Sequence, residues 1–145
     1  MIYEGTIKYE TVTNKGNTKV VRESYLIEDA ETFSEAESVL FGFANKSSLE
    51  IDVVSLKRSK IKEIANTNRD TMQMFIATLV DVFTDENGIE KEITYDIAFF
   101  AINIEEAHTF IRLYATQGYC MEMKALKQAK FLDVLKYGSA NLYRD

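Results

Sequence analysis

The chain of 145 residues has no proline or tryptophan, and it has only one cysteine, one histidine and six glycines. A single cysteine cannot form a disulfide within the chain, which fits a reducing, cytoplasmic compartment. One cysteine and one histidine also argue against the usual type of zinc site, so no metal or other cofactor is expected. Without proline, and with so few glycines, no segment has the composition of a linker between domains.

Long apolar runs and an excess of positive charge are absent as well. No apolar run approaches the roughly 18 residues that a membrane-spanning helix needs. The opening residues Met1 to Glu4 do not have the basic and apolar regions of a signal peptide, so no membrane association is expected. Asp and Glu total 23 against 17 Lys and Arg, a net charge of −6. This balance argues against coating nucleic acid by bulk charge but leaves a local basic patch open.

What the sequence does contain is a helical pattern that occurs twice. Both copies have apolar residues at the i, i+3, i+4, i+7 spacing of an amphipathic helix. Each copy also begins with a capping-box signal, Ser34 with Glu37 and Asn103 with Glu106. The helices are expected over residues 34–44, with Ala36, Val39, Leu40 and Phe43, and over residues 104–116, with Ala107, Phe110, Ile111 and Tyr114.

Alternating apolar and polar residues flank both helices, which indicates half-buried strands. Each helix follows two strands joined by a turn, and the turn at Asn87-Gly88 is a strong hairpin signal. One further strand follows each helix. The expected hairpins are Tyr3–Thr13 with Lys19–Ile27 and Met72–Thr84 with Ile89–Phe99, and the expected third strands are Leu49–Ile64 and Met121–Leu135.

The third strand of the second half contains a conflict between two signals. Residue propensity alone favours a helix over Met121–Lys130, whereas the corresponding segment of the first half is β-branched and alternates. The comparison of the two halves favours the strand. The adjacent pair Val53-Val54 interrupts the alternation and predicts a β-bulge.

Together these patterns predict an α+β fold built from a tandem β-β-α-β repeat with pseudo-two-fold symmetry. Neither half can bury its helix stripe alone, so we expect one antiparallel, curved sheet of about six strands packed by two helices. The repeats would span about residues 1–66 and 70–137 of a single domain, 1–145, with a short C-terminal extension.

Candidate catalytic residues are scattered. His108 falls beside the apolar stripe of the second helix, and Cys120 has no nearby cation to lower its pKa. The carboxylates Asp52, Asp81 and Asp133 fall on three separate expected strands, and no glycine-rich phosphate loop occurs. We therefore expect a protein that is not an enzyme; the alternative is a hydrolase or nuclease that uses clustered carboxylates with a divalent metal.

The segment from Lys57 to Lys62 is the best candidate for function, because it places four cations in six residues of an acidic chain. In a single strand, Arg58, Lys60 and Lys62 would share one face at a spacing of roughly 6.6 Å, close to the phosphate repeat of an extended nucleic-acid strand. Basic residues also protect edge strands from aggregation, which is the structural alternative. A weaker second copy consists of Lys124, Lys127 and Lys130, and the candidate stacking residues are Tyr9, Tyr25 and Tyr95 (with Tyr3).

Four segments in this order also resemble an uncharacterised domain-of-unknown-function family found in Bacteroidetes and in the crAss-like phages that infect them. They are Tyr3–Tyr9, Tyr25–Glu37, Leu56–Ile64 and Lys130–Leu135. The resemblance implies a small intracellular protein without established catalytic residues. The phage setting implies a role in binding single-stranded DNA during replication or recombination.

Two functions are therefore expected from the sequence. The first is a non-enzymatic module that binds single-stranded nucleic acid, most simply DNA, through Lys57, Arg58, Lys60 and Lys62 with tyrosine stacking. The second is a protein-interaction or structural module, such as a homo-oligomer or a protein that binds a host or virion partner, which the negative net charge and exposed sheet edges favour.

Overall fold

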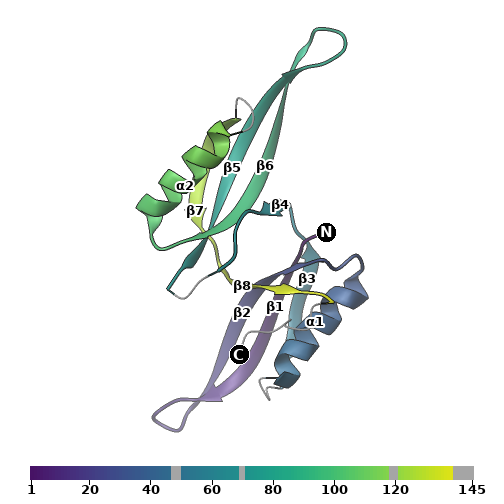
Figure 1. Ribbon diagram of the computed structural model, residues 1–145. Coiled ribbons are helices and arrows are strands. Elements are labelled where there is room, and N and C mark those ends of the chain that lie inside the picture. Colours follow the sequence, from purple (N-terminus) through teal and green to yellow (C-terminus); the bar gives the residue numbers. More distant parts are fainter. Residues whose placement is uncertain (47–49, 69–70, 118–120, 139–145) are drawn as a thin grey trace. The chain divides into compact units, whose positions relative to one another are not determined.

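The computed structural model describes residues 1–46, 50–68, 71–117 and 121–138. The described chain divides into two compact units. The first unit contains residues 1–59 together with the chain from residue 131, and the second contains residues 60–130. Each unit has one four-stranded sheet and one helix (Figure 1). The expected C-terminal extension lies, from residue 139, outside the described residues.

In the first unit the strand order is β3-β1-β2-β8. The pairs β1–β2 and β1–β3 are antiparallel, whereas β8 runs parallel to β2. Helix α1 packs against β1 and β3. The elements are β1 (Tyr3–Val12), β2 (Thr18–Glu28), α1 (Phe33–Lys46), β3 (Asp52–Arg58) and β8 (Phe131–Lys136).

The second unit has the corresponding order β4-β6-β5-β7, read from the opposite edge. The pairs β5–β6 and β5–β7 are antiparallel, and β4 runs parallel to β6. Helix α2 packs against β5, β6 and β7. The elements are β4 (Ile61–Ile64), β5 (Gln73–Thr84), β6 (Glu90–Ala101), α2 (Ile104–Thr116) and β7 (Met121–Gln128).

The two units exchange their last strands. The segment expected as one strand, Leu49–Ile64, is two strands: β3 ends in the first sheet and β4 joins the second. Likewise, β7 joins the second sheet and β8 returns to the first. Backbone hydrogen bonds fix both junctions, from Ser59 N to Ile2 O at 2.8 Å and from Ala129 N to Met74 O at 2.9 Å. The expectation of one antiparallel sheet of about six strands is therefore wrong. In the described residues eight strands form two four-stranded sheets, and each sheet contains one parallel pair.

Each unit also has its own apolar core. The first core contains Tyr3, Ile7, Ile27 and Leu40, with Leu135 contributed by the returning strand β8. The second core is built around Phe75, Leu79, Ile97, Phe99 and Ile111. The helical spacing therefore identified core residues correctly in both halves, although each helix packs on a complete sheet of its own unit.

Local features agree with the sequence in most places. Residues 121–128 form a strand, as the comparison of the halves predicted, because β7 pairs with β5 over seven residues. The bulge predicted at Val53-Val54 is also confirmed, since Thr6 pairs with Ser55 and Ile7 with Val53, which leaves Val54 unpaired.

The cap of α1 is a correction. Ser34 does not cap this helix, because the Glu35 N–H donates to Thr32 Oγ1 at 3.1 Å. The cap of α2 is confirmed, with the Glu106 N–H donating to Asn103 Oδ1 at 2.8 Å. In both helices the first-turn glutamate accepts from a backbone N–H just before the cap, at Glu31 and Ile102.

Candidate nucleic-acid interface

The predicted basic stripe is divided between the two units. Lys57 and Arg58 lie exposed at the end of β3, an edge strand of the first unit, opposite Glu4 and Tyr3 of β1. Lys60 and Lys62 belong to the second unit. The expected alternation of Arg58, Lys60 and Lys62 along one strand is therefore wrong, because the chain leaves one sheet at Ser59 and enters the other at Ile61.

The second basic group lies on the opposite edge of the second sheet from Lys62. Lys124 and Lys127 are exposed on β7, and Lys130 follows the end of that strand. Lys124 is the bulge residue of this strand, because Thr78 pairs with Ala125 and Leu79 with Met123. Three strand spacings, roughly 14 Å, separate β7 from β4, so these lysines do not extend a track that begins at Lys62.

Three of the four predicted stacking tyrosines are engaged elsewhere. Tyr3 is fully buried in the first core and its hydroxyl donates to Glu31 O at 3.2 Å, so it is not available for stacking. Tyr25 is buried in the first core against the Phe43 ring, at a centroid distance of 5.1 Å, so it cannot serve as an exposed platform. Its hydroxyl donates to Glu23 Oε2 at 3.4 Å, and Tyr9 bonds to the same carboxylate. Burial, then the Glu23 charge, raises the pKa of Tyr25 well above its ordinary value, and the bond to Glu23 raises the pKa of Tyr9. Both phenols therefore stay neutral.

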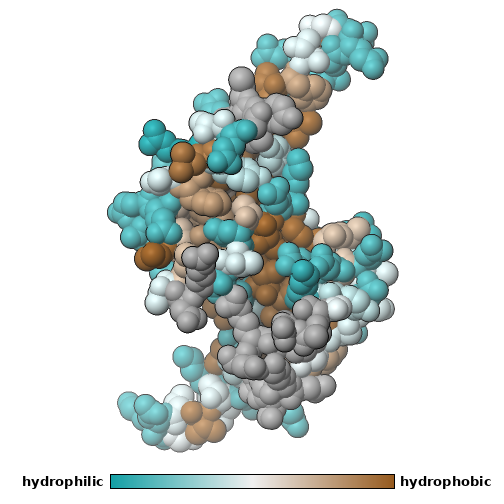
Figure 2. Space-filling model, in the orientation of Figure 1, coloured by the Kyte–Doolittle hydropathy of each residue, from teal (hydrophilic) through white to brown (hydrophobic). Residues whose placement is uncertain are grey.

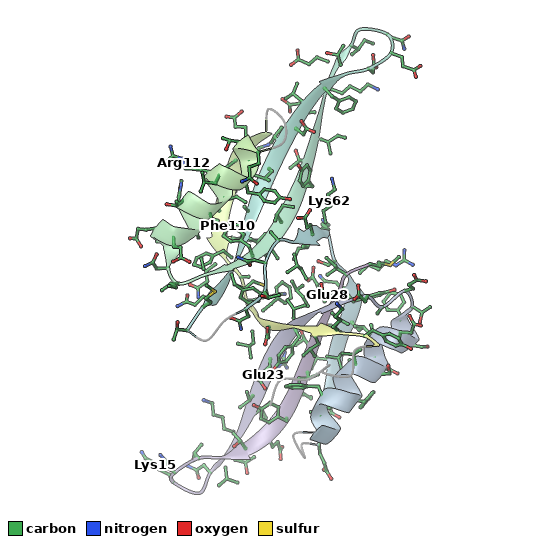
Figure 3. All side chains as sticks on the ribbon, in the orientation of Figure 1. Lys15, Glu23, Glu28, Lys62, Phe110 and Arg112 are labelled. Atoms are coloured by element: carbon green, nitrogen blue, oxygen red, sulfur yellow. The ribbon has the colours of Figure 1, made fainter. Side chains whose placement is uncertain are left out.

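The ring of Tyr95, the remaining predicted tyrosine, is contacted by a predicted cation. The Lys62 ammonium lies 4.2 Å from the centroid of the Tyr95 ring, within the range of a cation–π interaction. Lys62 is exposed and Tyr95 is half-buried, and Figure 3 shows Lys62 projecting from β4. The bulge explains this position: Ile61 pairs with Asp96 and Glu63 with Ile97, so Lys62 is left out of the ladder and its side chain is re-aimed.

Three residues that sequence reasoning did not select complete this site. The Tyr114 hydroxyl donates to Glu63 Oε1 at 2.9 Å, which links α2 to β4. The Tyr114 ring stacks on Phe110 at 6.4 Å, and Phe110 stacks on Phe99 at 4.9 Å. The spacing of Phe110 and Tyr114 marked them as core residues, and both are indeed packed against the core, but they remain partly exposed. We call Lys62, Glu63, Tyr95, Phe110 and Tyr114 the tyrosine cluster.

The electrostatics of the tyrosine cluster are mixed. Burial raises the pKa of Tyr114 to about 12, with a further contribution from the bond to Glu63. Burial also raises the pKa of Tyr95, and the charges of Asp81 and Glu63 add to that effect. These carboxylates reduce the attraction for a phosphate, so a bound anion would depend on Lys62 and neighbouring Lys60.

The residues considered for catalysis are divided between the two units. Asp52 on β3 and Asp133 on β8 belong to the first unit, opposite Lys8 and Tyr25 respectively, whereas Asp81 lies on β5 of the second. Across the described ranges, no group of three or more His, Cys, Asp and Glu side chains is arranged to hold a metal ion. His108 is exposed on α2, and Cys120 lies outside the described residues. Among the helices of the described chain, none is long and apolar enough to span a membrane.

The fold and the site define a mixed α/β protein, whose described residues form two helices and eight strands in two sheets. The family described as "Domain of unknown function (DUF4494)" matches residues 1–137, and the chain belongs to this family. No curated protein and no solved structure matches the chain.

Proposed function

We propose that the protein is a non-enzymatic binding module for single-stranded nucleic acid, most simply DNA, and that the tyrosine cluster of the second unit is its contact site. The observation that carries the proposal is the Lys62 ammonium 4.2 Å above the Tyr95 ring. This geometry puts a phosphate-binding cation and a base-stacking ring within the reach of one nucleotide.

Binding requires a base to replace the Lys62 ammonium on the Tyr95 ring, and the energies of these two contacts favour the base. A base that stacks on Tyr95 displaces Lys62 from the ring, which costs about 0.5–1 kcal/mol at an exposed site. Stacking of a base on an aromatic side chain contributes about 1–3 kcal/mol, and the displaced ammonium is then free to contact a phosphate. Lys62 therefore covers the Tyr95 ring in the free protein and contacts a phosphate in the complex.

The basic residues on β3 and β7 have a structural role in this proposal. Lys57, Arg58, Lys124 and Lys127 are exposed on edge strands, and none forms an ion pair with another described residue. Lysines on an edge discourage pairing with another strand. The contact site thus keeps Lys62 and Tyr95 from the residues expected in the sequence and gains Tyr114. Lys60, two positions before Lys62, is expected to supply a second phosphate contact.

Binding of a fluorescein-labelled oligodeoxythymidine, followed by anisotropy, tests this function. Two phosphate contacts give a slope of log K against log salt of roughly −1.4, so affinity falls several-fold between about 50 and 200 mM salt. Tyr95→Ala is expected to weaken binding by about 5- to 100-fold, whereas Tyr95→Phe keeps the stacking surface and most of the affinity.

Lys62→Glu has a matched control in Lys127→Glu, which makes the same charge change on the other edge of the same sheet. The proposal expects a large loss for Lys62→Glu and a small one for Lys127→Glu. Equal losses would indicate non-specific attraction, and absence of binding by the unaltered protein at low salt would reject the function altogether.

Duplication of a β-β-α-β segment, extended by one strand, is the origin we infer for the two units. Its support is the matching register: bulges fall between Thr6 and Ile7 and between Thr78 and Leu79, 72 positions apart. The phage replication setting implied by the sequence resemblance stays a prediction.

A protein-interaction module is the second candidate function. The β5–β6 hairpin favours it, because Val82, Phe83, Ile89 and Ile93 are exposed there in an acidic chain. Exposed apolar side chains rimmed by charges are typical of surfaces that bind another protein.

A further inference from the structure

Both hairpins extend beyond the strands that flank them. In the first unit, β3 pairs with β1 only as far as Lys8, and β8 pairs with β2 only from Ser24 onward. In the second unit, β7 pairs with β5 as far as Asp81, and β4 pairs with β6 from Asp96 onward. Within the described chain, residues 9–23 and 82–95 are therefore two-stranded, with no strand on either outer edge. We call residues 9–23 the first ribbon and residues 82–95 the second ribbon.

The two ribbons end in the same type of turn. The Gly16 N–H donates to Thr13 O at 2.9 Å, and the Gly88 N–H donates to Asp85 O at 3.0 Å. Both glycines have positive φ, at 80° and 77°, a conformation that other residues rarely adopt. The ribbons are therefore equivalent in backbone and differ in their side chains.

Both ribbons expose apolar side chains. Val12 is 72% exposed in the first ribbon and Ile89 is 57% exposed in the second, where Phe83 and Ile93 are also exposed. Figure 2 shows hydrophobic residues among hydrophilic ones towards the ends of both hairpins. A two-stranded ribbon is marginally stable alone in water, and its unpaired backbone groups are a template for another strand. Each ribbon would thus be stabilised by a partner that covers it.

The charges of the ribbons are opposite. The first ribbon has three cations against two carboxylates, a net charge of +1, and the second has one cation against four carboxylates, a net charge of −3. Figure 3 shows Lys15 at the end of the first hairpin. The charged residues are Glu10, Lys15, Lys19, Arg22 and Glu23 in the first ribbon and Asp85, Glu86, Glu90, Lys91 and Glu92 in the second.

We propose that the first ribbon of one copy of this chain docks on the second ribbon of another copy. Contacts between like ribbons bring charges of the same sign together, whereas contacts between unlike ribbons pair +1 with −3 and cover apolar side chains on both sides. The contact joins two different surfaces, so it is head-to-tail and produces a ring or a filament. This association does not depend on the proposed binding of nucleic acid.

Sedimentation velocity of the full chain, treated with nuclease to remove bridging nucleic acid, tests the proposal. The unaltered chain is expected to form oligomers at low salt that dissociate as salt rises, because the contact pairs opposite charges. The triple variant Lys15→Glu, Lys19→Glu, Arg22→Glu makes both ribbons acidic and is expected to be monomeric. The triple variant Glu86→Lys, Glu90→Lys, Glu92→Lys makes both basic and is also expected to be monomeric.

Mixing provides the decisive measurement. An equimolar mixture of the two variants contains acidic and basic ribbons in both required combinations, so oligomers are expected to return. A control variant with the same three-charge reversal on other exposed strands, Lys57→Glu, Lys124→Glu, Lys127→Glu, is expected to associate like the unaltered chain.

Three results would each overturn the proposal: a monomeric unaltered chain at low salt, triple variants that still associate alone, or a mixture that stays monomeric. All substitutions lie on exposed side chains, and far-UV circular dichroism with thermal melting verifies that each variant is folded. A variant that failed to fold would be replaced by Val12→Asp in the first ribbon or Ile89→Asp in the second, with the same loss of association expected.

Discussion

The returning strand β8 gives the sharpest test of the fold, because it carries one deeply buried leucine and one exposed leucine three residues apart. Leu135 is 1% exposed and belongs to the core of the first unit, whereas Leu132 is 54% exposed. Leu132 is also the residue left out of the ladder, since Phe131 pairs with Ser24 and Asp133 with Tyr25. Replacing each leucine with alanine removes the same atoms from two very different environments.

The magnitudes follow from burial. Truncation of a fully buried leucine costs about 2–5 kcal/mol, which includes the cavity that remains. Truncation of an exposed side chain without special contacts usually stays within about 0.5 kcal/mol. The free energy of unfolding of an ordinary domain is about 5–15 kcal/mol, so Leu135→Ala removes a large part of this stability.

Urea denaturation measures both free energies of unfolding, and amide hydrogen exchange in the native state shows which unit loses protection. We expect Leu135→Ala to reduce protection in β1 and β2 of the first unit, since β8 pairs there. Equal effects of the two substitutions, or loss of protection confined to β5 and β6, would refute the strand exchange.

Three further predictions concern single contacts. Gly5→Ala would place its Cβ 2.8 Å from Leu40 Cδ1, so we expect a loss of about 1–3 kcal/mol in urea denaturation, partly relieved by adding Leu40→Val. Asn103→Ala removes the cap of α2 and should cost about 0.5–2 kcal/mol in the same assay. The pKa of Tyr114, raised to about 12, should fall in the Glu63→Gln variant when its ring resonances are titrated by NMR. Since folding favours the protonated phenol, this stabilisation is complete below about pH 10 and lost as the pH rises through about 12.

The controls for these three predictions come from the same chain. Ser34 was predicted as a cap but does not cap α1, so Ser34→Ala should change the free energy of unfolding by no more than about 0.5 kcal/mol. Thr32→Ala should reduce it by about as much as Asn103→Ala does. Additivity of Gly5→Ala and Leu40→Val would contradict the steric explanation. The Tyr114→Phe variant identifies the titrating resonance, and an unchanged pKa in Glu63→Gln would show that burial alone accounts for the shift.

Local structure could be predicted from the sequence because its causes are local. The apolar spacing of Ala107 and Ile111 identified α2 and its buried side, and alternation identified all four hairpin strands. Comparison of the halves gave the correct strand over residues 121–128 despite their helical propensity. Pairing with β5 and the packing of Met123 and Leu126 against the core outweigh propensities of a few tenths of a kcal/mol.

The exchange of strands could not be predicted in this way. Ile61 and Phe131 are buried apolar residues at the start of β4 and β8, and such a residue fits the edge of either sheet equally well. Which sheet β4 or β8 joins depends on which distant strand has a free edge, and the periodicity within the segment does not indicate that strand. Ser59-Lys60 and Ala129-Lys130, where the chain crosses, lack the glycine or proline that marks most breaks.

The error in the candidate site follows from that missed exchange. Alternation along a single strand would have aligned Arg58, Lys60 and Lys62, but the break after Ser59 assigns Arg58 to a different sheet. Tyr25 was interpreted as a possible platform because alternation does not tell which face of a strand the helix covers. The burial of Tyr25 against Phe43 of α1 shows that its side chain lies on the face that the helix covers.

The tyrosine cluster depends on positions where the two units differ, and this explains why only one unit has it. The bulge that re-aims Lys62 is matched in the first unit by a bulge at Leu132, which has no charge to offer a phosphate. Tyr95 pairs with Leu79, and the corresponding position opposite Ile7 is Glu23, which would repel a phosphate. Both units therefore have the same backbone geometry at this position. The second unit is a candidate contact for a nucleotide because it has Lys62 and Tyr95 there. If nucleic acid binds, its contacts should consequently fall on the second unit, even though the basic residues of β3 make the first unit equally conspicuous in the sequence.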